Sequence, residues 1–307
     1  MKVFAPGKLV LTGAYAVLEG APAIVVATSR GAVADTAFCT ATPTPEVRAA
    51  IGDAPAPAPA MDASALFDGD RKLGLGASAA ILVASLGAIA VREGAQDLSD
   101  AKFRDVLFAR ARGAHAAVQR GGSGVDVAAS VFGGTLRYVM GARPERVVLP
   151  PGIQLAVFAC PKSARTTDLR ARVDALASSD PATHRAHLGD LARIARAAAD
   201  AVSEGDRAAF IARVADAARS LARLGEASGA PIVPPGLDAL SDLAVEEGGA
   251  FCVSGAGGGD VAFFVSGTRP SPTFVERAAA LGLAVLDVTL DEKGVRALPA
   301  IAVAPDA

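Results

Sequence analysis

The chain has 307 residues, more than one hydrophobic core usually serves, so two domains are expected. Its 51% hydrophobic content is ample for burial, and 30 basic against 32 acidic residues leave a net charge of −2. The chain has no excess of positive charge to attract a polyanion, and with no Trp and two Tyr it has few aromatic rings for stacking on bases. A nucleic acid is therefore not expected as a partner.

The cysteines and histidines argue against disulfide and zinc frameworks. Cys39, Cys160 and Cys252 are widely separated and odd in number, which is typical of reduced, mostly buried thiols. None of the three histidines lies in a Cys/His cluster with zinc spacing. The first residues enter a turn and lack the apolar core of a secretory signal, so we expect a cytoplasmic protein.

The N-terminal 62 residues divide into two parts of different composition. Short strands and turns are predicted over residues 2–40, where apolar runs at 8–11 and 23–27 alternate with glycines. Residues 41–62 are rich in Ala, Pro and Thr, and their prolines argue against a central strand or helix. We interpret this segment as an exposed connection, with a proline-rich recognition ligand as the alternative.

An uncharged stretch at residues 73–91 opens with Gly-Leu-Gly-Ala-Ser-Ala-Ala at 74–80 and continues with the apolar positions Ile81 and Leu82. Small residues leave backbone N–H groups open, and such a loop at a helix N-terminus is a natural anion site. The pattern predicts a nucleotide triphosphate at the start of a buried helix, or else a plain Gly-rich packing turn. Its length also permits a membrane span, against which the small residues and missing aromatic belt argue.

Helices and strands alternate along the rest of the chain. Ser99 is the expected N-cap of a helix to about Gln119, and Asp180 and Asp206 cap two further helices. The remaining predictions are a helix around 126–131, strands at 135–140 and 153–159, a helix from 236 to about 247, strands at 250–253 and 261–265, a helix at 272–281 and a strand at 283–288.

The order of these last elements resembles part of a split βαβ layout, in which helices cover one side of an antiparallel sheet. Pro150-Pro151-Gly152 marks a seam. The predicted domains are therefore residues 1–150 and 151–307.

Three Gly-rich segments stand out, at residues 5–8, 74–80 and 254–260, with Gly-Gly-Ser-Gly-Val-Asp at 121–126 between the second and third. None is a Walker A loop or a dinucleotide-binding fingerprint. Each is weak by itself, and their order along the chain is the specific signal.

In this order the segments resemble the GHMP superfamily of small-molecule kinases, named for galactokinase, homoserine kinase, mevalonate kinase and phosphomevalonate kinase, and within it the phosphomevalonate kinases. The likeness extends from residues 5–18 to residues 254–260. It implies an α+β, two-domain GHMP kinase fold, with an N-terminal ATP-binding lobe like ribosomal S5 domain 2 and a C-terminal ferredoxin-like lobe. It also implies ATP and Mg2+ as cofactors and a phosphorylated or hydroxylated small molecule as the acceptor. No membrane partner is expected, and a homodimer is compatible with the resemblance.

The resemblance places the phosphate-binding loop at residues 74–80, preceded by a lysine. The cofactor-binding residues that it implies are Lys72, Gly74, Leu75, Gly76, Ala77, Ser78, Ala79 and Ala80. Ser78 matches one of the hydroxyl residues of the family's loop. Its hydroxyl is expected to contact magnesium or a phosphate. Ala77 stands where the family has another hydroxyl, so we expect altered nucleotide affinity rather than loss of binding.

Two residues match the family's catalytic pair. Asp126 matches the carboxylate that takes or polarises the acceptor proton, and Lys8 matches the lysine beside it and the transferring phosphoryl group. Phosphoryl transfer places negative charge on the equatorial oxygens, so the protein chiefly positions reactants and supplies positive charge. Taken alone, Asp126 would be a helix-cap or turn residue and Lys8 a surface lysine.

The chain departs from the family at two places. Residues 114–119 lack the metal-binding Glu usual in mevalonate kinases, so magnesium is expected to depend mainly on Ser78, ATP oxygens and water. The Ala-His and nearby Gln in this stretch are common in phosphomevalonate kinases, which favours that resemblance. His115 in this stretch is interpreted as a packed, hydrogen-bonded helix residue rather than one with a direct role. Ala14 stands where the family more often has Glu, so any part of that Glu in orienting Lys8 must be filled otherwise or lost.

The acceptor site is expected to include a cation. We hypothesise that Lys162 or Arg165 recognises an anionic acceptor, because a phosphate on the substrate needs a charge-assisted partner. The full set of substrate-binding residues that the resemblance implies is Lys8, Tyr15, Ser123, Lys162, Arg165, Thr166, Gly257 and Gly258.

The implied reaction converts 5-phosphomevalonate and ATP to 5-diphosphomevalonate and ADP, a step of the mevalonate pathway to isoprenoid precursors. A mevalonate kinase or another GHMP small-molecule or sugar kinase is the nearest alternative, followed by an ATP-dependent decarboxylase of the same fold. A non-catalytic nucleotide-binding module is the alternative of a different class, since Ala14 and Ala77 could signal decay. The presence of Lys8, Ser78 and Asp126 argues against it.

Overall fold

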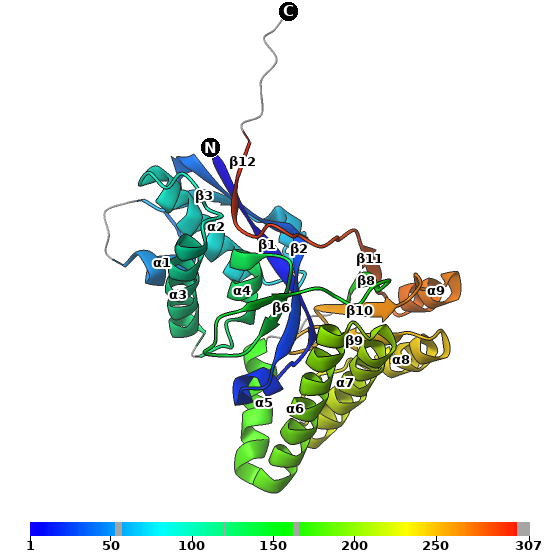
Figure 1. Ribbon diagram of the computed structural model, residues 1–307. Helices are drawn as coiled ribbons and strands as arrows, with labels where there is room; N and C mark the ends of the chain where they lie inside the picture. The colour runs from blue at the N-terminus through cyan, green and yellow to red at the C-terminus, as the bar shows by residue number, and fades with distance from the viewer. Residues whose placement is uncertain (53–56, 120, 162–165, 300–307) are drawn as a thin grey trace, which may run out of the picture.

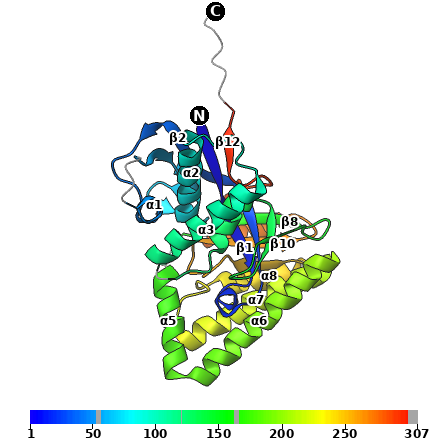
Figure 2. The same ribbon diagram turned by 60° about the vertical axis from the view of Figure 1, so that its left-hand side comes forward.

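The computed structural model describes residues 1–52, 57–119, 121–161 and 166–299. Its strands form two main sheets, each covered by helices (Figures 1 and 2). The elements of the first half are β1 (Lys2–Thr12), the 3-10 helix η1 (Ala16–Glu19), β2 (Ala23–Cys39), α1 (Pro45–Ile51), β3 (Pro59–Asp62), the 3-10 helix η2 (Ser64–Leu66), β4 (Phe67–Asp68), β5 (Arg71–Lys72), α2 (Ala77–Arg92), α3 (Ala101–Val118), α4 (Val125–Phe132), β6 (Thr135–Tyr138) and β7 (Glu145–Val147).

Two long antiparallel strands, β1 and β2, form the centre of the larger sheet, whose order is β12-β1-β2-β6-β7 with β3 added to β2. The strands predicted at 8–11 and 23–27 are therefore confirmed as parts of β1 and β2, whereas their shortness and the early turn are wrong, because each strand continues over a longer range. Pro6 and Gly7 stay in β1 because the register shifts between them, and an irregularity of this kind tolerates a proline in a strand.

The prediction that prolines keep residues 41–62 out of a helix is also wrong, since this segment contains α1, whereas its strand β3 pairs only with β2 among the described strands and is not a central strand. Its prolines occupy the positions that regular structure permits. Pro45 begins α1 behind the N-cap Thr44, whose side chain accepts from the Val47 amide, and Pro59 begins β3.

Helix α2 is the buried helix predicted from residues 73–91. Leu82, Val83 and Leu86 of its apolar face are each 2% exposed or less, and the helix packs on β1 and β2 (Figure 1). None of the helices in the described ranges is both long enough and apolar enough to cross a membrane. The next helix, α3, is capped by Asp100 rather than by the predicted Ser99, because Asp97 accepts hydrogen bonds from the amide and hydroxyl of Ser99.

The second half builds the smaller sheet. Its elements are β8 (Gln154–Ala159), α5 (Thr166–Ser179), α6 (Pro181–Glu204), α7 (Arg207–Ser228), α8 (Leu237–Glu246), β9 (Ala250–Val253), β10 (Val261–Ser266), α9 (Pro272–Ala280), β11 (Ala284–Leu286) and β12 (Arg296–Leu298). The order β11-β8-β10-β9, antiparallel throughout, confirms the split βαβ layout. Helix α5 was not predicted, although Leu169, Val173 and Leu176 recur on one face and are buried.

The cysteines behave largely as predicted. All three are free thiols in the described part of the chain, with Cys160 and Cys252 buried and Cys39 exposed. Burial raises the pKa of Cys160 to about 11 and that of Cys252 to about 12, so both thiols are protonated at neutral pH.

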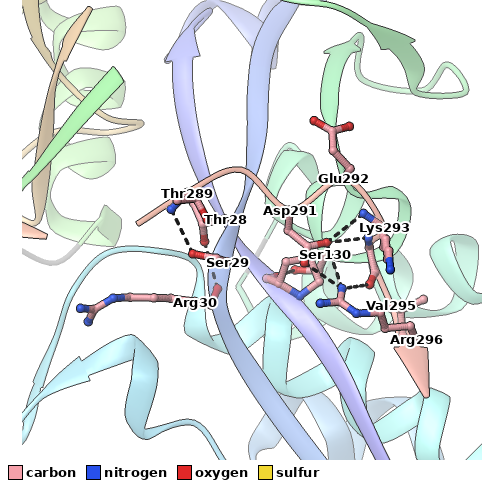
Figure 3. Close-up of polar contacts among 12 residues, drawn as sticks. Thr28, Ser29, Arg30, Ser130, Thr289, Asp291, Glu292, Lys293, Val295 and Arg296 are labelled. Atoms are coloured by element: carbon pink, nitrogen blue, oxygen red, sulfur yellow. Dashed lines mark hydrogen bonds and ion pairs between the residues drawn. The ribbon is translucent and has the colours of Figure 1, made fainter. Parts of the chain in front are cut away.

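After β11 the chain returns to the larger sheet through residues 287–298, which we call the C-terminal strap (Figure 1, where β12 lies beside β1). Figure 3 shows its polar contacts. The buried carboxylate of Asp291 accepts from the amides of Lys293 and Gly294 and from the Arg296 guanidinium, while its backbone bonds to Ala27 and Gly134.

The strap also fixes α4. The Val295 amide donates to the Val131 carbonyl, and a Cβ on Gly294 would lie 2.4 Å from that oxygen. From the other side, the Ser130 hydroxyl donates to the Pro6 carbonyl of β1. Residues 1–150 and 151–307 remain our proposed domains, and the strap joins the second to the sheet of the first.

Replacing Asp291 by Ala should destabilise the protein by about 3 kcal/mol, because it leaves two strap amides and the Arg296 guanidinium without their acceptor. Glu292→Ala is the matched control. Its carboxylate is 69% exposed and pairs with a surface arginine, so the expected change is below about 0.5 kcal/mol. Urea unfolding measures both, and equal effects would show that the Asp291 network does not hold the strap.

Candidate active site

Lys8 on β1 contacts two of the Gly-rich segments. Its amide donates to the Leu75 carbonyl at 2.8 Å, and its Nζ donates to the Gly74 carbonyl at 2.9 Å. A Cβ on Gly255 would lie 3.6 Å from Lys8 Nζ, so the turn at 254–260 also approaches the ammonium group. The Lys8 ammonium group on β1 therefore lies between the loop at 74–80 and the turn at 254–260, which come from the two halves of the chain.

Burial lowers the pKa of Lys8 from its ordinary value, and the negative charges of Asp126 and Asp260 oppose that shift. The carboxylates thus favour the charged form of an ammonium group that has lost much of its hydration. Such a cation needs little reorganisation to meet an incoming anion.

The N-terminus of α2 lies beside Lys8. Gly76 caps the helix with φ +79° and has no side chain to accept from the first turn, so those amides stay available to a ligand. A Cβ on Gly76 would lie 3.0 Å from Lys8 Cγ and 3.6 Å from Asp126 Cβ. The structure therefore brings together Lys8, the loop at 74–80 and Asp126.

Asp126 occupies the first turn of α4, behind the N-cap Gly124. Its Oδ1 accepts from the Val127 amide at 2.9 Å, as expected of a helix-start Asp. Its Oδ2 lies 3.5 Å from Nε2 of His115, and the side chain is 20% exposed. One carboxylate oxygen thus accepts a hydrogen bond within α4, and the other lies beside the His115 ring.

His115 on α3 is packed and hydrogen-bonded, with 6% of the residue exposed. Its Nε2 lies 3.2 Å from the Ser78 hydroxyl as well as 3.5 Å from Asp126. The sequence interpretation anticipated a hydrogen-bonded residue but not its partners, which are both expected site residues on other helices.

Tyr15 and Ile232 both contact the turn at 254–260. The Tyr15 hydroxyl donates to the Ala256 carbonyl at 2.8 Å, and burial, together with the negative charge of Asp174, raises its pKa. The Gly258 amide donates to Ile232, and a Cβ on Gly257 would lie 2.2 Å from the Ile232 carbonyl oxygen. The Tyr15 hydroxyl is therefore bonded to the turn, and the Gly258 amide already has a protein acceptor.

The other expected site residues are spread more widely. The Ser123 carbonyl accepts from the Tyr138 hydroxyl, and Thr166 is exposed at the start of α5. Lys72 is exposed on β5. Lys162 and Arg165 lie outside the described residues.

Two residues of the turn at 254–260 contact the site region but were absent from the sequence-based set. The Ser254 hydroxyl accepts from the Val10 amide at 2.9 Å, which ties the turn to β1. Asp260 lies against the backbone of the loop at 74–80, since a Cβ on Gly74 would come within 2.2 Å of Asp260 Cβ. The available signal was an acidic residue directly after a run of small residues.

The described residues hold no group of three or more His, Cys, Asp or Glu side chains arranged for a metal ion. Oxygen donors are nevertheless present in the Ser78 hydroxyl and the Asp126 carboxylate. Together with the open amides of α2 and the Lys8 ammonium, they suit a polyanion that brings most of a metal's ligands itself.

Comparisons with known proteins agree with this architecture. The family model for the GHMP kinases C terminal region matches residues 187–281. A curated phosphomevalonate kinase from Streptomyces sp. (strain CL190) is 31% identical over 221 residues, which span 64% of this chain and 58% of that protein.

Solved structures show the same fold along nearly the whole chain. The Lin0012 protein from Listeria innocua superposes with a TM-score of 0.82 at 22% identity, covering 96% of this chain and 98% of that one. The Streptococcus pneumoniae phosphomevalonate kinase, solved with phosphomevalonate and AMPPNP, gives a TM-score of 0.75 at 20% identity and covers 94% and 99%. The chain therefore has the fold of these kinases, and residues 187–281 are similar to the GHMP kinases C terminal region.

Proposed function

We propose that this protein is an ATP-dependent kinase that transfers the γ-phosphoryl group to 5-phosphomevalonate, giving 5-diphosphomevalonate and ADP. The observation that carries the kinase proposal is the meeting of Lys8, the loop at 74–80 and Asp126 around the two glycine-capped helix starts. The acceptor is proposed from the Streptomyces relative, whose name gives that activity to that protein.

The nucleotide phosphates are proposed to bind at the N-terminus of α2. Open first-turn amides and the positive end of the helix dipole favour anions there, and Gly76 lets the chain approach closely. Bound Mg2+ would neutralise phosphate charge, with Ser78 as its protein ligand beside nucleotide oxygens and water. Ala77, 7% exposed, has no hydroxyl to offer, so backbone amides carry more of the phosphate contacts.

Lys8 and Asp126 have different roles in the proposed phosphoryl transfer. The Lys8 ammonium stabilises the negative charge on the transferring phosphoryl group, and its pairing with the Gly74 carbonyl holds it at the loop. The Asp126 carboxylate, through Oδ2, orients the acceptor hydroxyl and receives its proton.

The acceptor's own phosphate is proposed to bind near the start of α5. Arg170 of this helix donates to the Gly121 carbonyl at 2.7 Å, which places α5 next to the segment at 121–126. Lys162 and Arg165, which precede α5 in the chain, remain the proposed cations for that phosphate.

A coupled ADP-release assay with Mg2+ and ATP tests the acceptor. The expected result is turnover with 5-phosphomevalonate that exceeds the acceptor-free rate, and little with mevalonate, galactose or homoserine. Turnover of mevalonate but not its phosphate would overturn the acceptor assignment. Release of carbon dioxide would show a decarboxylase instead, and nucleotide binding without turnover would favour a non-catalytic module.

Lys8→Met and Asp126→Asn should each lower kcat by about a hundredfold or more, because each removes charge at the reacting atoms. Nucleotide affinity should change little in Asp126→Asn, since that side chain faces the acceptor. Steady-state kinetics and calorimetric titration with an ATP analogue measure the two effects separately. Unchanged turnover in either variant would remove that residue from the mechanism.

Gly76→Ala should weaken nucleotide binding about tenfold, because the new Cβ meets Lys8 Cγ at 3.0 Å and alanine disfavours a positive φ. Gly141→Ala is the matched control, with φ +88° but open space around its Cβ position. Calorimetry with the ATP analogue should separate them. Equal affinities would show that the close approach at Gly76 is not needed for the nucleotide.

A further inference from the structure

We propose that His115 is a positioning residue, which shares one ring N–H between Ser78 and Asp126 and so couples the phosphate loop to the proton-accepting carboxylate. This inference rests on the proposed kinase function and deepens it. The sequence interpretation gave His115 no direct role.

The geometry puts a single nitrogen between the two site residues. His115 Nε2 lies 3.2 Å from Ser78 Oγ and 3.5 Å from Asp126 Oδ2, and the three residues belong to α3, α2 and α4. The imidazole side chain is 8% exposed, against 20% for the carboxylate. Because the ring is enclosed, its polar atoms depend on protein partners at this point.

The carboxylate determines which nitrogen carries the proton. An unprotonated Nε2 would set its lone pair against the anionic Asp126 oxygen, whereas Nε2–H is attracted to it. The same N–H also faces the Ser78 oxygen, so it acts as a three-centre donor. The Ser78 hydroxyl then keeps its own proton or lone pair for the ligand at the loop.

Two contacts at once restrain two helix starts. Asp126 already uses Oδ1 for the Val127 amide, so the His115 contact to Oδ2 completes the orientation of the carboxylate. Ser78, held by the same nitrogen, keeps its hydroxyl at the phosphate loop. Catalytic groups that are held by a further hydrogen-bonding residue lose activity when that residue is removed, although it never touches the substrate.

A pair of amide substitutions separates positioning from simple packing. In His115→Gln the side-chain nitrogen is as many bonds from Cα as Nε2 is, so the N–H donor is retained. In His115→Asn the chain is one bond shorter and the donor cannot reach both partners. Both variants remove the ring, so the loss of packing is similar.

With the acceptor that wild-type protein turns over, His115→Asn should lower kcat about 10- to 100-fold with a smaller change in KM, while His115→Gln stays within about fivefold of wild type. Thermal unfolding should show similar midpoints for the two variants. His187→Gln on α6 is the control for histidine removal and should be unchanged. Equal losses in Gln and Asn, or none in either, would overturn the inference.

Combining His115→Asn with Asp126→Asn tests the coupling. If the imidazole acts chiefly through Asp126, the double variant should be about as slow as Asp126→Asn alone rather than slower by the product of both factors. Multiplicative losses would show that His115 does not act through that carboxylate.

Ring 15N chemical shifts supply a readout that needs no activity. The chain has three histidines, and the His115 signals are those that disappear in His115→Gln. A proton on Nε2 is expected, and an unprotonated Nε2 would overturn the proposal. Wild-type protein that phosphorylates no acceptor would instead remove the proposed function, while active wild-type protein with equal Gln and Asn variants removes this inference alone.

Discussion

The site depends on the close approach of β1 to the loop before α2. Lys8 forms two hydrogen bonds with the carbonyls of Gly74 and Leu75, one from its amide and one from its ammonium group. Small residues make this approach possible. A Cβ on Gly7 would lie 2.5 Å from the Leu75 oxygen, and one on Gly76 would lie 3.0 Å from Lys8 Cγ. The glycines of these motifs thus set the distance between the lysine and the helix that is proposed to hold phosphate.

Residues distant from the site maintain this arrangement. The Ser130 hydroxyl joins the last turn of α4 to the Pro6 carbonyl, two residues before the lysine, and the C-terminal strap binds the same end of α4 through Val131. Asp291, 7% exposed, organises the strap through its bonds to two amides and a guanidinium group. The last described strand, β12, completes the edge of the sheet that carries Lys8. Elements from the start of the chain (β1), from its middle (α4) and from its last described strand (β12) therefore support the same site.

Ala14 and Ala77 stand where the resemblance to the GHMP kinases leads us to expect polar side chains, and other polar groups interact at the candidate site. Asp126 and Asp260 both supply negative charge to Lys8, so the ammonium group retains carboxylate partners without a Glu at position 14. Near Ala77, the Ser78 hydroxyl is joined to His115. These interactions join elements that are far apart in the sequence.

The sequence by itself determined the helix at 73–91, the split βαβ order after residue 236 and the motifs containing Lys8, Ser78 and Asp126, because local composition and periodicity encode these features. It did not indicate that Pro6 and Gly7 stay in a strand, or that prolines at 45 and 59 begin a helix and a strand. Those outcomes depend on pairing partners and caps supplied by other segments. Only the tertiary structure placed His115 between Ser78 and Asp126 and brought Asp260 to the loop at 74–80. Contacts between helices and turns so far apart along the chain follow from packing, and no local pattern in the sequence specifies them.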